Sequence, residues 1–599
     1  MAVYPPRSKV EKKQTWNAES VFKNRRAWQD ELNTILTDLD AVRRFQGRLG
    51  EGPATLLDAL SAYEKLLVRA ERVYMYAGFA HAVDTTDQHS VGAVDQAAAM
   101  FGQVAAALAF LSPEVLAIGR PRLDEWMEQD TRLAVYRHSF DDLFRKQEHI
   151  RSGEVEQLLG MLADPFAGPQ NTAGVLTNAD FRFEPAVNGK GRKLVVTQSS
   201  IHDILAGPDR AARRSAWNHY MDRHVEFQNT LASNLATSIK ANVFSTRARR
   251  HESSLAASLF ESNIPVQVFH NLIDTFKRHL PVWHRYFDLR RRALGLSSLA
   301  YYDMWAPLER HDIKITFREA VDMICDGLQP MGSDYTDVLR RGCLQERWVD
   351  FAPNRGKQNG AFSYGAPGTH PFVMMSFTGD IPSLSTLAHE LGHSMHSYLT
   401  WKNQPLAYSE YSLFVAEVAS NFHQAMVRAH LLNANTSRKF QIAVIEEAMS
   451  NFFRYFFLMP TLARFELEMH QRAERGEALT AGSMIDLMAD LLAEAFGPRV
   501  RVDRPRAGMV WSTFSHLFSD YYVYQYATGI SGAQALSGRI LRGEPHAVED
   551  YLGFLRSGSS DYPLEVLRGA GVDLSSPAPV EETFGVMQDY IGRLEKLLS

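Results

Sequence analysis

Apolar residues recur at intervals of three or four positions through most of the chain, which is the spacing of one face of an amphipathic helix. The pattern runs from about residue 16 to 160, returns between 209 and 290, and returns again after residue 417 as far as about 500. It predicts a mainly α-helical protein. The clearest early example is formed by Trp28, Leu32, Ile35, Leu36, Leu39 and Val42.

The stretch 165–208 interrupts this periodicity. Two short runs at 181–187 and 193–197 flank the turn residues Asn188-Gly189, which is typical of a β-hairpin. Gly207-Pro208-Asp209 then predicts a helix start. We expect an N-terminal helical domain, 1–207, that ends with the hairpin, and a second domain, 208–599. The residues that break the helical pattern here are Pro165, Gly168, Pro169 and Gly174.

Composition and charge narrow the class of protein. The 599 residues carry a net charge of −5, which gives no strong attraction to nucleic acid or to an anionic membrane. The beginning of the chain lacks the apolar core of a signal peptide, and the apolar run from Val104 ends at Ser112-Pro113, a predicted helix start, so no membrane-spanning stretch is expected. Two cysteines, Cys325 and Cys343, are too few for a disulfide framework. We expect a cytoplasmic protein without nucleic-acid or membrane partners.

The sequence His389-Glu390-Leu391-Gly392-His393 is the strongest chemical signal. On a helix, positions i and i+4 share one face, so His389 and His393 can reach one metal ion together. Glu390 lies beside that face, within reach of a water on the metal. The alternative is a polar helix face whose two histidines bond to nearby carbonyl groups.

Glu417 is the candidate third ligand, because it lies 24 residues after His393 in the mostly apolar run 414–420. A buried carboxylate is costly unless it is paired or binds a metal. Two His and one Glu form a catalytic zinc set, which predicts one zinc ion per chain; cobalt and manganese also suit these ligands. A salt bridge to an arginine is the alternative for Glu417. His396 is expected to pack or to support a ligand, because position 399 is Leu, not the histidine of the metzincin pattern.

Two further stretches carry candidate chemistry. The Gly-rich segment 357–365 lacks the ending of a phosphate loop, and 371–377 predicts a strand directly before the metal helix. Such a strand can pair with an extended substrate, although an ordinary core strand fits equally well. Farther on, His516 and four tyrosines between 521 and 526 could donate hydrogen bonds to an oxyanion, or could be core tyrosines with a solvated hydroxyl.

Taken together, these motifs resemble oligoendopeptidase F, of the thimet-oligopeptidase-like family of zinc metallopeptidases. The similarity covers nearly the whole chain. The motifs that carry it are Gly360-Ala361-Phe362-Ser363, Ser376-Phe377-Thr378-Gly379, 386–394, Gln404-Pro405, 414–420, His516 and 522–529.

The resemblance implies a mainly helical fold with two lobes around a deep channel, the zinc helix at the channel floor and a small β element beside it. It implies that His389, His393 and Glu417 bind zinc and that Glu390 is the general base. It assigns a catalytic role to His516 and Tyr524, and substrate binding to Gly360, Ala361, Tyr522 and Tyr526. The family has Glu where this chain has Gln424, which can still accept an imidazole N–H but carries no charge, so metal affinity is expected to be somewhat lower.

The activity expected from these features is zinc-dependent cleavage of internal peptide bonds in short oligopeptides. One alternative is a zinc carboxypeptidase or dipeptidyl carboxypeptidase on the same architecture. A second is a peptide-binding protein without catalysis. The sequence leaves a monomer and a homodimer equally open.

Overall fold

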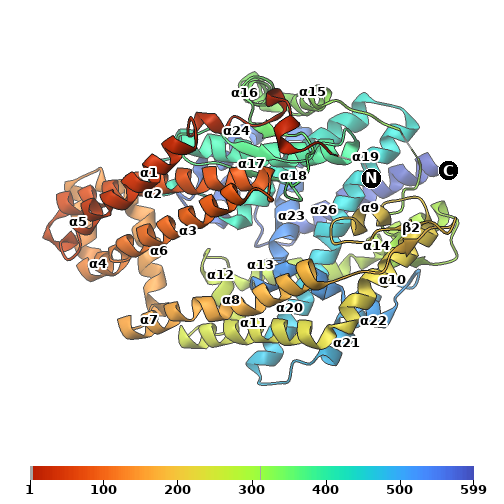
Figure 1. Ribbon diagram of the computed structural model, residues 1–599, viewed down its shortest axis with the longest axis horizontal. Helices are drawn as coiled ribbons and strands as arrows, with labels where there is room; N and C mark the ends of the chain where they lie inside the picture. The colour runs from red at the N-terminus through yellow and green to blue at the C-terminus, as the bar shows by residue number, and fades with distance from the viewer. Residues whose placement is uncertain (1–3, 311) are drawn as a thin grey trace. The chain divides into compact units, whose positions relative to one another are not determined.

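The computed structural model describes residues 4–310 and 312–599, and these are mainly α-helical (Figure 1). They form two compact units, each assembled from three segments of the chain. The first unit comprises Met1–Glu148, Lys314–His430 and Arg539–Gly571, and the second comprises His149–Ile313, Leu431–Gly538 and Val572–Ser599. The expected division into 1–207 and 208–599 is a different partition of the chain and stays a prediction, as does the channel between two lobes.

Long helices make up most of both units. Those of the first unit are α1 (Arg25–Arg43), α2 (Pro53–Val83), α3 (Gln88–Leu108), α4 (Leu111–Ile118), α5 (Arg120–Gln129), α6 (Arg137–Lys146), α15 (Phe317–Gly327), α16 (Ser333–Leu344), α17 (Ile381–Asn403), α18 (Leu413–Ala434), α24 (Ala547–Ser557) and α25 (Pro563–Gly569).

The second unit contains the remaining α-helices. They are α7 (Gly153–Met161), α8 (Ala163–Val175), α9 (Ile201–Leu205), α10 (Arg210–Glu226), α11 (Gln228–Ala248), α12 (Ser254–Phe260), α13 (Val266–Arg278), α14 (Leu280–Ala293), α19 (Arg438–Phe452), α20 (Met459–Glu474), α21 (Ala481–Phe496), α22 (Arg504–Ala507), α23 (Tyr524–Leu541, which runs into the first unit) and α26 (Ala578–Leu598).

Helices α1, α2 and α3 lie side by side (Figure 1) and share an apolar core. The predicted helical face of α1 is confirmed, since Trp28, Leu32, Ile35, Leu39 and Val42 are all buried. Their neighbours in this core come from the apolar faces of the other two helices, which is why the 3.6-residue periodicity was visible in the sequence.

One apolar stretch behaves differently from the prediction. Within the described residues, Gln88–Ile118 is long and apolar enough to cross a membrane by length and composition, so the prediction that no stretch reaches that length is wrong. The helix is interrupted between α3 and α4, and α3 packs against α1 and α2, with 22% of the apolar window buried. Helix α4 begins at Leu111, one residue before the predicted cap Ser112, and Pro113 falls in its first turn, where no N–H donor is needed.

The first unit contains a small three-stranded sheet beside α17. Strand β6 (Phe372–Met374) lies in the middle, parallel to β4 (Val349–Asp350) and antiparallel to β5 (Phe362–Tyr364). All three residues of β6 are buried. The strand predicted at 371–377 therefore exists, but both of its edges are occupied. The two edge strands of this sheet are β4 and β5.

The predicted hairpin is also present, as the antiparallel pair β1 (Ala186–Val187) and β2 (Lys193–Leu194). The helix break predicted at 165–174 is wrong, because α8 runs through this segment. Pro165 lies in the first turn of α8, and Pro169, inside the helix, forgoes one hydrogen bond but is itself buried, as is Ala173. Packing of α8 along α11 (Figure 1) offsets the local cost.

Aromatic rings fill much of the second unit's core. Trp283 and Phe287 of α14 contact Phe453 and Phe457, and Phe496 closes the cluster from the end of α21. Two short strands pair in parallel: β3 (Leu299–Ala300), which follows α14 in the chain, and β7 (Val500–Arg501), which follows α21. This pairing joins segments about two hundred residues apart, which local patterning does not reveal.

A buried ion cluster anchors the end of β4 in the first unit. The Asp350 carboxylate is 0% exposed and accepts hydrogen bonds from Arg7 (2.9 Å) and from the Lys357 ammonium (2.7 Å). Lys357 also donates to the carbonyl oxygens of Ala352 and Met375. Burial lowers the pKa of Lys357, and the charge of Asp350 opposes that shift.

We expect Asp350→Asn to destabilise the protein by about 3–5 kcal/mol, because it leaves Lys357 buried without its counter-charge. Urea unfolding followed by circular dichroism measures the effect. Asp322→Asn is the matched control, since Asp322 pairs with Arg340 at the surface and an exposed pair contributes about 0–1 kcal/mol. Equal midpoints for the two variants would contradict this assignment.

Candidate metal centre

Helix α17 carries the first two candidate ligands. Its beginning is fixed by Asp380, whose side chain accepts the backbone N–H of Ser383 (2.9 Å), and by Pro382 in the first turn. The helix ends at Asn403. Between these ends the helix is regular, so His389 and His393 lie one turn apart on one face, with ring centroids 5.0 Å apart.

Helix α18 brings Glu417 to the same place, and the two helices approach very closely there. A β-carbon at position 392 would lie 2.5 Å from the carbonyl oxygen of Ala419 and 2.6 Å from the α-carbon of Ser420. Only glycine permits this distance. Gly392, inside the metal motif, therefore sets the separation between the two histidines and Glu417.

The three side chains converge as one ligand set. Glu417 Oε2 lies 3.4 Å from His389 Nε2 and 4.0 Å from His393 Nε2, and the donor atoms of all three lie within 4.8 Å of one another. Tetrahedral zinc with bonds of about 2.0–2.2 Å separates its ligands by roughly 3.3–3.5 Å. The His389–Glu417 distance matches this spacing and the His393–Glu417 distance exceeds it by about half an ångström, so the two imidazoles and the carboxylate are placed to hold a zinc ion.

Neighbouring groups orient the first histidine. His389 Nδ1 donates to Gln424 Oε1 (3.3 Å), which leaves Nε2 free and turned toward Glu417. Gln424 in turn donates through Nε2 to the hydroxyl of Ser385 (2.8 Å), one helical turn before His389. An amide therefore supports the imidazole, as expected for Gln424, but without the negative charge that would make the ring a stronger ligand.

The ionisation states also suit a metal. Burial lowers the pKa of His393 to about 4, so its imidazole is neutral at physiological pH, as a metal ligand requires. Burial works to raise the pKa of Glu417, but His389, His393 and a hydrogen bond from the Ser420 hydroxyl (2.9 Å) outweigh it and keep the pKa low. The set thus offers a neutral imidazole at His393 and a carboxylate at Glu417.

Glu390 lies next to this set and is nearly fully enclosed. It is 5% exposed, and burial, with the charge of Glu417 adding to it, raises its pKa to about 7. The backbone of Ser363, in the edge strand β5, donates to the carboxylate. Its Oε2 atom is buried and has no hydrogen-bond partner among the described residues. A carboxylate held this way is available to a water or to a substrate.

His396 is not one of the converging groups. Its ring stacks on Tyr411 at 3.7 Å and packs near Phe554, and burial lowers its pKa to about 3. These contacts make it a packing residue of α17.

The predicted substrate-binding residues Gly360 and Ala361 directly precede the edge strand β5. Gly360 has φ +88°, a conformation that favours glycine, and it is exposed. Within the part of the chain that the structure describes, β5 pairs only with β6. Its outer edge is not paired with another described strand, although the Ser363 backbone donates to Glu390, and the Ser363 hydroxyl lies 2.8 Å from the Ser394 hydroxyl of the metal helix.

The structure groups three of the four other predicted residues within the second unit. The rings of His516 and Tyr522 stack at 5.7 Å, Tyr526 lies edge-on to both, and the Tyr526 hydroxyl donates to the Tyr522 hydroxyl (3.1 Å). Tyr524 does not share their half-exposed face, since it is 1% exposed and packs on Phe269. Its catalytic role stays a prediction, and its burial favours Tyr522 and Tyr526 as the accessible hydroxyls.

Glu466 of α20 holds the turn that precedes these tyrosines, and the sequence analysis missed it. Tyr521 has φ +49°, unusual for a residue with a side chain, and its N–H donates to Glu466 Oε1 (2.7 Å). Burial raises the pKa of Glu466 well above its ordinary value. A carboxylate in an apolar helical run was the available signal, the same one that singled out Glu417.

These observations define a mainly helical protein with a candidate metal centre, and its similarity to known proteins assigns it to a family of peptidases. The chain belongs to peptidase family M3: a model of that family matches residues 204–586. A model described as oligopeptidase F matches residues 114–183. The predicted resemblance to oligoendopeptidase F is thereby confirmed, as is the mainly α fold.

Relatives match over almost the full length of the chain. Oligopeptidase PepF of Bacillus subtilis is 35% identical over 595 residues, covering 99% of this chain and 88% of that protein. A crystal structure of a putative peptidase from Chlamydophila abortus superposes with a TM-score of 0.88 at 29% identity, covering 99% of this chain and 100% of that one. Oligoendopeptidase-F from Enterococcus faecium superposes with a TM-score of 0.75 at 28% identity, covering 96% and 99%.

We expect Gly392→Ala to force α17 and α18 apart, because the added methyl group meets backbone atoms that cannot rotate away. The cost should be about 1–3 kcal/mol of stability, with a fall in zinc affinity of about tenfold or more. Thermal unfolding and a competition titration with a fluorescent zinc chelator measure the two effects. Gly553→Ala in α24 is the control, since a β-carbon there meets nothing within 4 Å. Unchanged zinc affinity in Gly392→Ala would contradict the role of this contact.

Glu466→Gln should make the protein more stable than wild type at pH 8 and similar to it near pH 4. The folded-state pKa of Glu466 is raised, so its stabilising protonated form is present below the unfolded-state pKa and is lost as pH rises toward the folded-state pKa. Across that window wild type should lose about 1.4 kcal/mol per pH unit relative to the variant. Urea unfolding of both proteins from pH 4 to 8 gives the difference. A gap that is constant with pH would refute the assignment.

Proposed function

We propose that this peptidase is a zinc-dependent endopeptidase that cleaves internal bonds of short oligopeptides. The observation that carries the proposal is the convergence of His389, His393 and Glu417 with the buried carboxylate of Glu390 beside them. Peptide substrates follow from the family. The identity of the metal, cleavage at internal rather than terminal bonds, and the roles of individual residues are inferences.

A zinc ion held by the three ligands would polarise the scissile carbonyl and make a water at the open position more acidic. Glu390 then accepts a proton from the attacking water and passes it to the leaving amine. Burial raises the pKa of Glu390 to about 7. The positive charge of a bound cation lowers that pKa and favours the carboxylate that the base must be.

The edge of β5 is the proposed binding strand for the substrate. An extended peptide can add to this edge with main-chain hydrogen bonds, which do not depend on side-chain identity. Gly360 and Ala361 directly precede β5 in the chain. The Ser363 backbone, within the strand, donates a hydrogen bond to Glu390. The peptide backbone would therefore be aligned by the same strand that orients the general base.

For the oxyanion we propose hydrogen bonds from His516 with Tyr522 and Tyr526, on the basis of the family resemblance and of their mutual contacts. Removal of one such donor typically costs about 10²- to 10³-fold in turnover. The catalytic role predicted for Tyr524, which is buried against Phe269, remains a prediction. The cytoplasmic location, the absence of nucleic-acid and membrane partners, and a monomer or homodimer remain predictions.

Cleavage of an internally quenched peptide tests the proposal. Internal cuts identified by mass spectrometry, lost with a chelator and restored by zinc, are the expected result. A substrate with an amidated C-terminus should still be cut internally. Removal of terminal residues alone would favour the carboxypeptidase alternative, and equal peptide affinity without cleavage in zinc-loaded protein would favour the binding-protein alternative.

Glu390→Gln should retain zinc and lose nearly all turnover, because the amide cannot accept the proton. We expect kcat/KM to fall by at least about 10²-fold, at the lower end of typical general-base contributions. Zinc content by mass spectrometry and cleavage of the quenched peptide measure both properties. Glu549→Gln, an exposed position in α24, is the matched control. Near wild-type cleavage by Glu390→Gln would show that another group is the base.

A further inference from the structure

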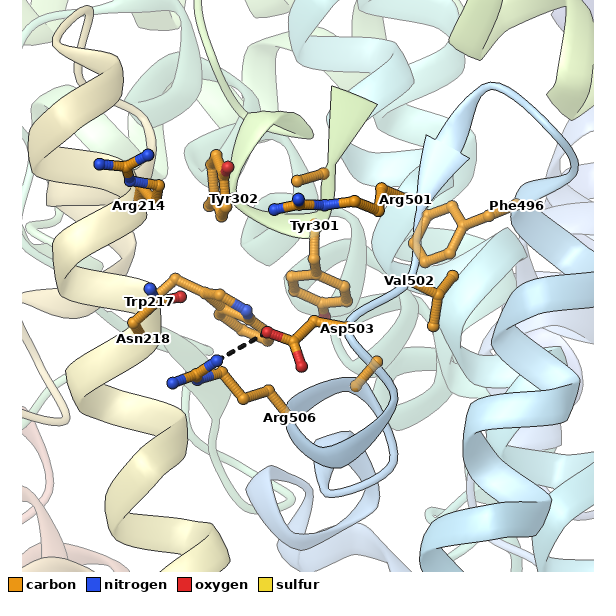
Figure 2. A pocket seen from close by; sticks show the side chains of 12 residues that line it. Arg214, Trp217, Asn218, Tyr301, Tyr302, Phe496, Arg501, Val502, Asp503 and Arg506 are labelled. Carbon is orange, nitrogen blue, oxygen red and sulfur yellow. Dashed lines mark hydrogen bonds and ion pairs between the residues drawn. The ribbon is translucent and has the colours of Figure 1, made fainter. Parts of the chain in front are cut away.

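A cavity in the second unit is built from segments that the proposed chemistry does not use. It has a volume of about 310 Å³ and lies between α10, the turn that follows β3, and the segment from β7 into α22 (Figure 2). All of its lining residues belong to this unit. The volume is at the lower end of the range for small-molecule sites.

Two arginines at this cavity lack counter-charges. The side chains of Arg214 in α10 and Arg501 in β7 are exposed, and neither guanidinium forms a hydrogen bond or ion pair with a described residue. In Figure 2 the side chain of Arg501 extends from β7 into the space framed by Arg214, Tyr302 and Trp217. Their guanidinium groups are donors only and remain charged at all physiological pH values.

The neighbouring arginines are different, because their charges are already neutralised. Arg506 pairs with Asp222 and with Asp503, the single acidic residue of the lining. Arg210 and Arg213, on the same helix as Arg214, both pair with buried Asp303. The acidic groups of the cavity are thus engaged, and the two unpaired guanidiniums remain for a ligand.

The other polar groups of the lining are mixed: the Trp217 indole donates, whereas the Asn218 amide and the hydroxyls of Tyr301 and Tyr302 both donate and accept. The indole N–H of Trp217 has no acceptor among the described residues, although the side chain is only 6% exposed, and the hydroxyls of Tyr301 and Tyr302 form no hydrogen bond there either. An indole can only donate. A ligand with acceptor atoms can accept a hydrogen bond from every one of these groups, and its negative charge would match the two arginines.

The apolar part of the lining is planar. The rings of Trp217 and Tyr301 are stacked at 4.1 Å with an interplanar angle of 18°, and Arg210 lies over the ring of Tyr302. Stacked aromatic rings form a rigid surface that favours contact with another flat ring. Phe496 and Val502 complete the apolar lining.

We propose that this cavity binds a small anion in which a carboxylate or phosphate group is carried by a molecule with a planar aromatic ring. Arg214 and Arg501 hold the anionic group by charge-assisted hydrogen bonds, and the Trp217–Tyr301 pair contacts the ring. The proposal does not depend on the peptidase mechanism, because no residue of the candidate metal centre lines the cavity.

Isothermal titration of the full chain with two ring-bearing anions tests the proposal and distinguishes the sources of the anionic group. The probes are 4-hydroxybenzoate for an aromatic carboxylate and adenosine monophosphate for an aromatic phosphate, each compared with fragments that lack the ring (acetate, inorganic phosphate) or the charge (phenol, adenosine). We expect one-site binding of at least one ring-bearing anion, at least tenfold tighter than either of its fragments. Bound ligand should change tryptophan fluorescence, and Trp217→Phe should remove that change.

Arg501→Gln and Arg214→Gln should each weaken binding by about tenfold or more. Arg504→Gln is the matched control: it removes the same charge from α22, but Arg504 is paired with Asp490 and does not line the cavity. Circular dichroism and cleavage of the quenched peptide should be unchanged in all three variants. The proposal is overturned if neither ring-bearing anion binds, if the neutral fragments bind as tightly, or if Arg504→Gln weakens binding as much as the other two substitutions.

Discussion

The candidate active site depends on one contact, the approach of α17 to α18 at Gly392. The ligands come from two helices, so their separation is set by how closely the helix backbones can lie, and a β-carbon at position 392 would meet Ala419 and Ser420 below 3 Å. Side-chain flexibility could not compensate for a wider gap without loss of the shared ligand geometry. The three ligands can therefore bind one metal ion only if position 392 has no β-carbon.

The same close packing determines the electrostatics. Glu390 and His393 are enclosed by these helices and β5, and their pKa values move in opposite directions for one reason, the cost of burying charge. The result is a site with a neutral imidazole and a carboxyl group poised near neutral pH. Gln424 adds support without charge through its contacts with His389 and Ser385. The negative electrostatic potential at the metal site therefore comes mainly from the carboxylates of Glu417 and Glu390.

Three features could be predicted from the sequence because each depends on residues close together in the chain. They are the helical face of α1, the metal motif, and the helix start at Asp209, whose side chain accepts the backbone N–H of Ala212 (3.0 Å). The helix through Pro169, the pairing of β3 with β7 and the edge position of β5 could not be predicted, because each depends on partners far away in sequence. Glu466 shows the same limit: its carboxylate was visible, but its partner, the left-handed turn at Tyr521, lies 55 residues later. Burial separates Tyr524 from Tyr522 and Tyr526, a distinction that tyrosine spacing alone does not make.

The central claim, that His389, His393 and Glu417 form one zinc site, is tested most directly by anomalous diffraction. Crystals of the chain grown with equimolar zinc would be measured above and below the zinc absorption edge. The account predicts one anomalous peak bonded to Nε2 of His389, Nε2 of His393 and a carboxylate oxygen of Glu417. Crystals with zinc bound at other residues, and no peak between these three, would contradict it.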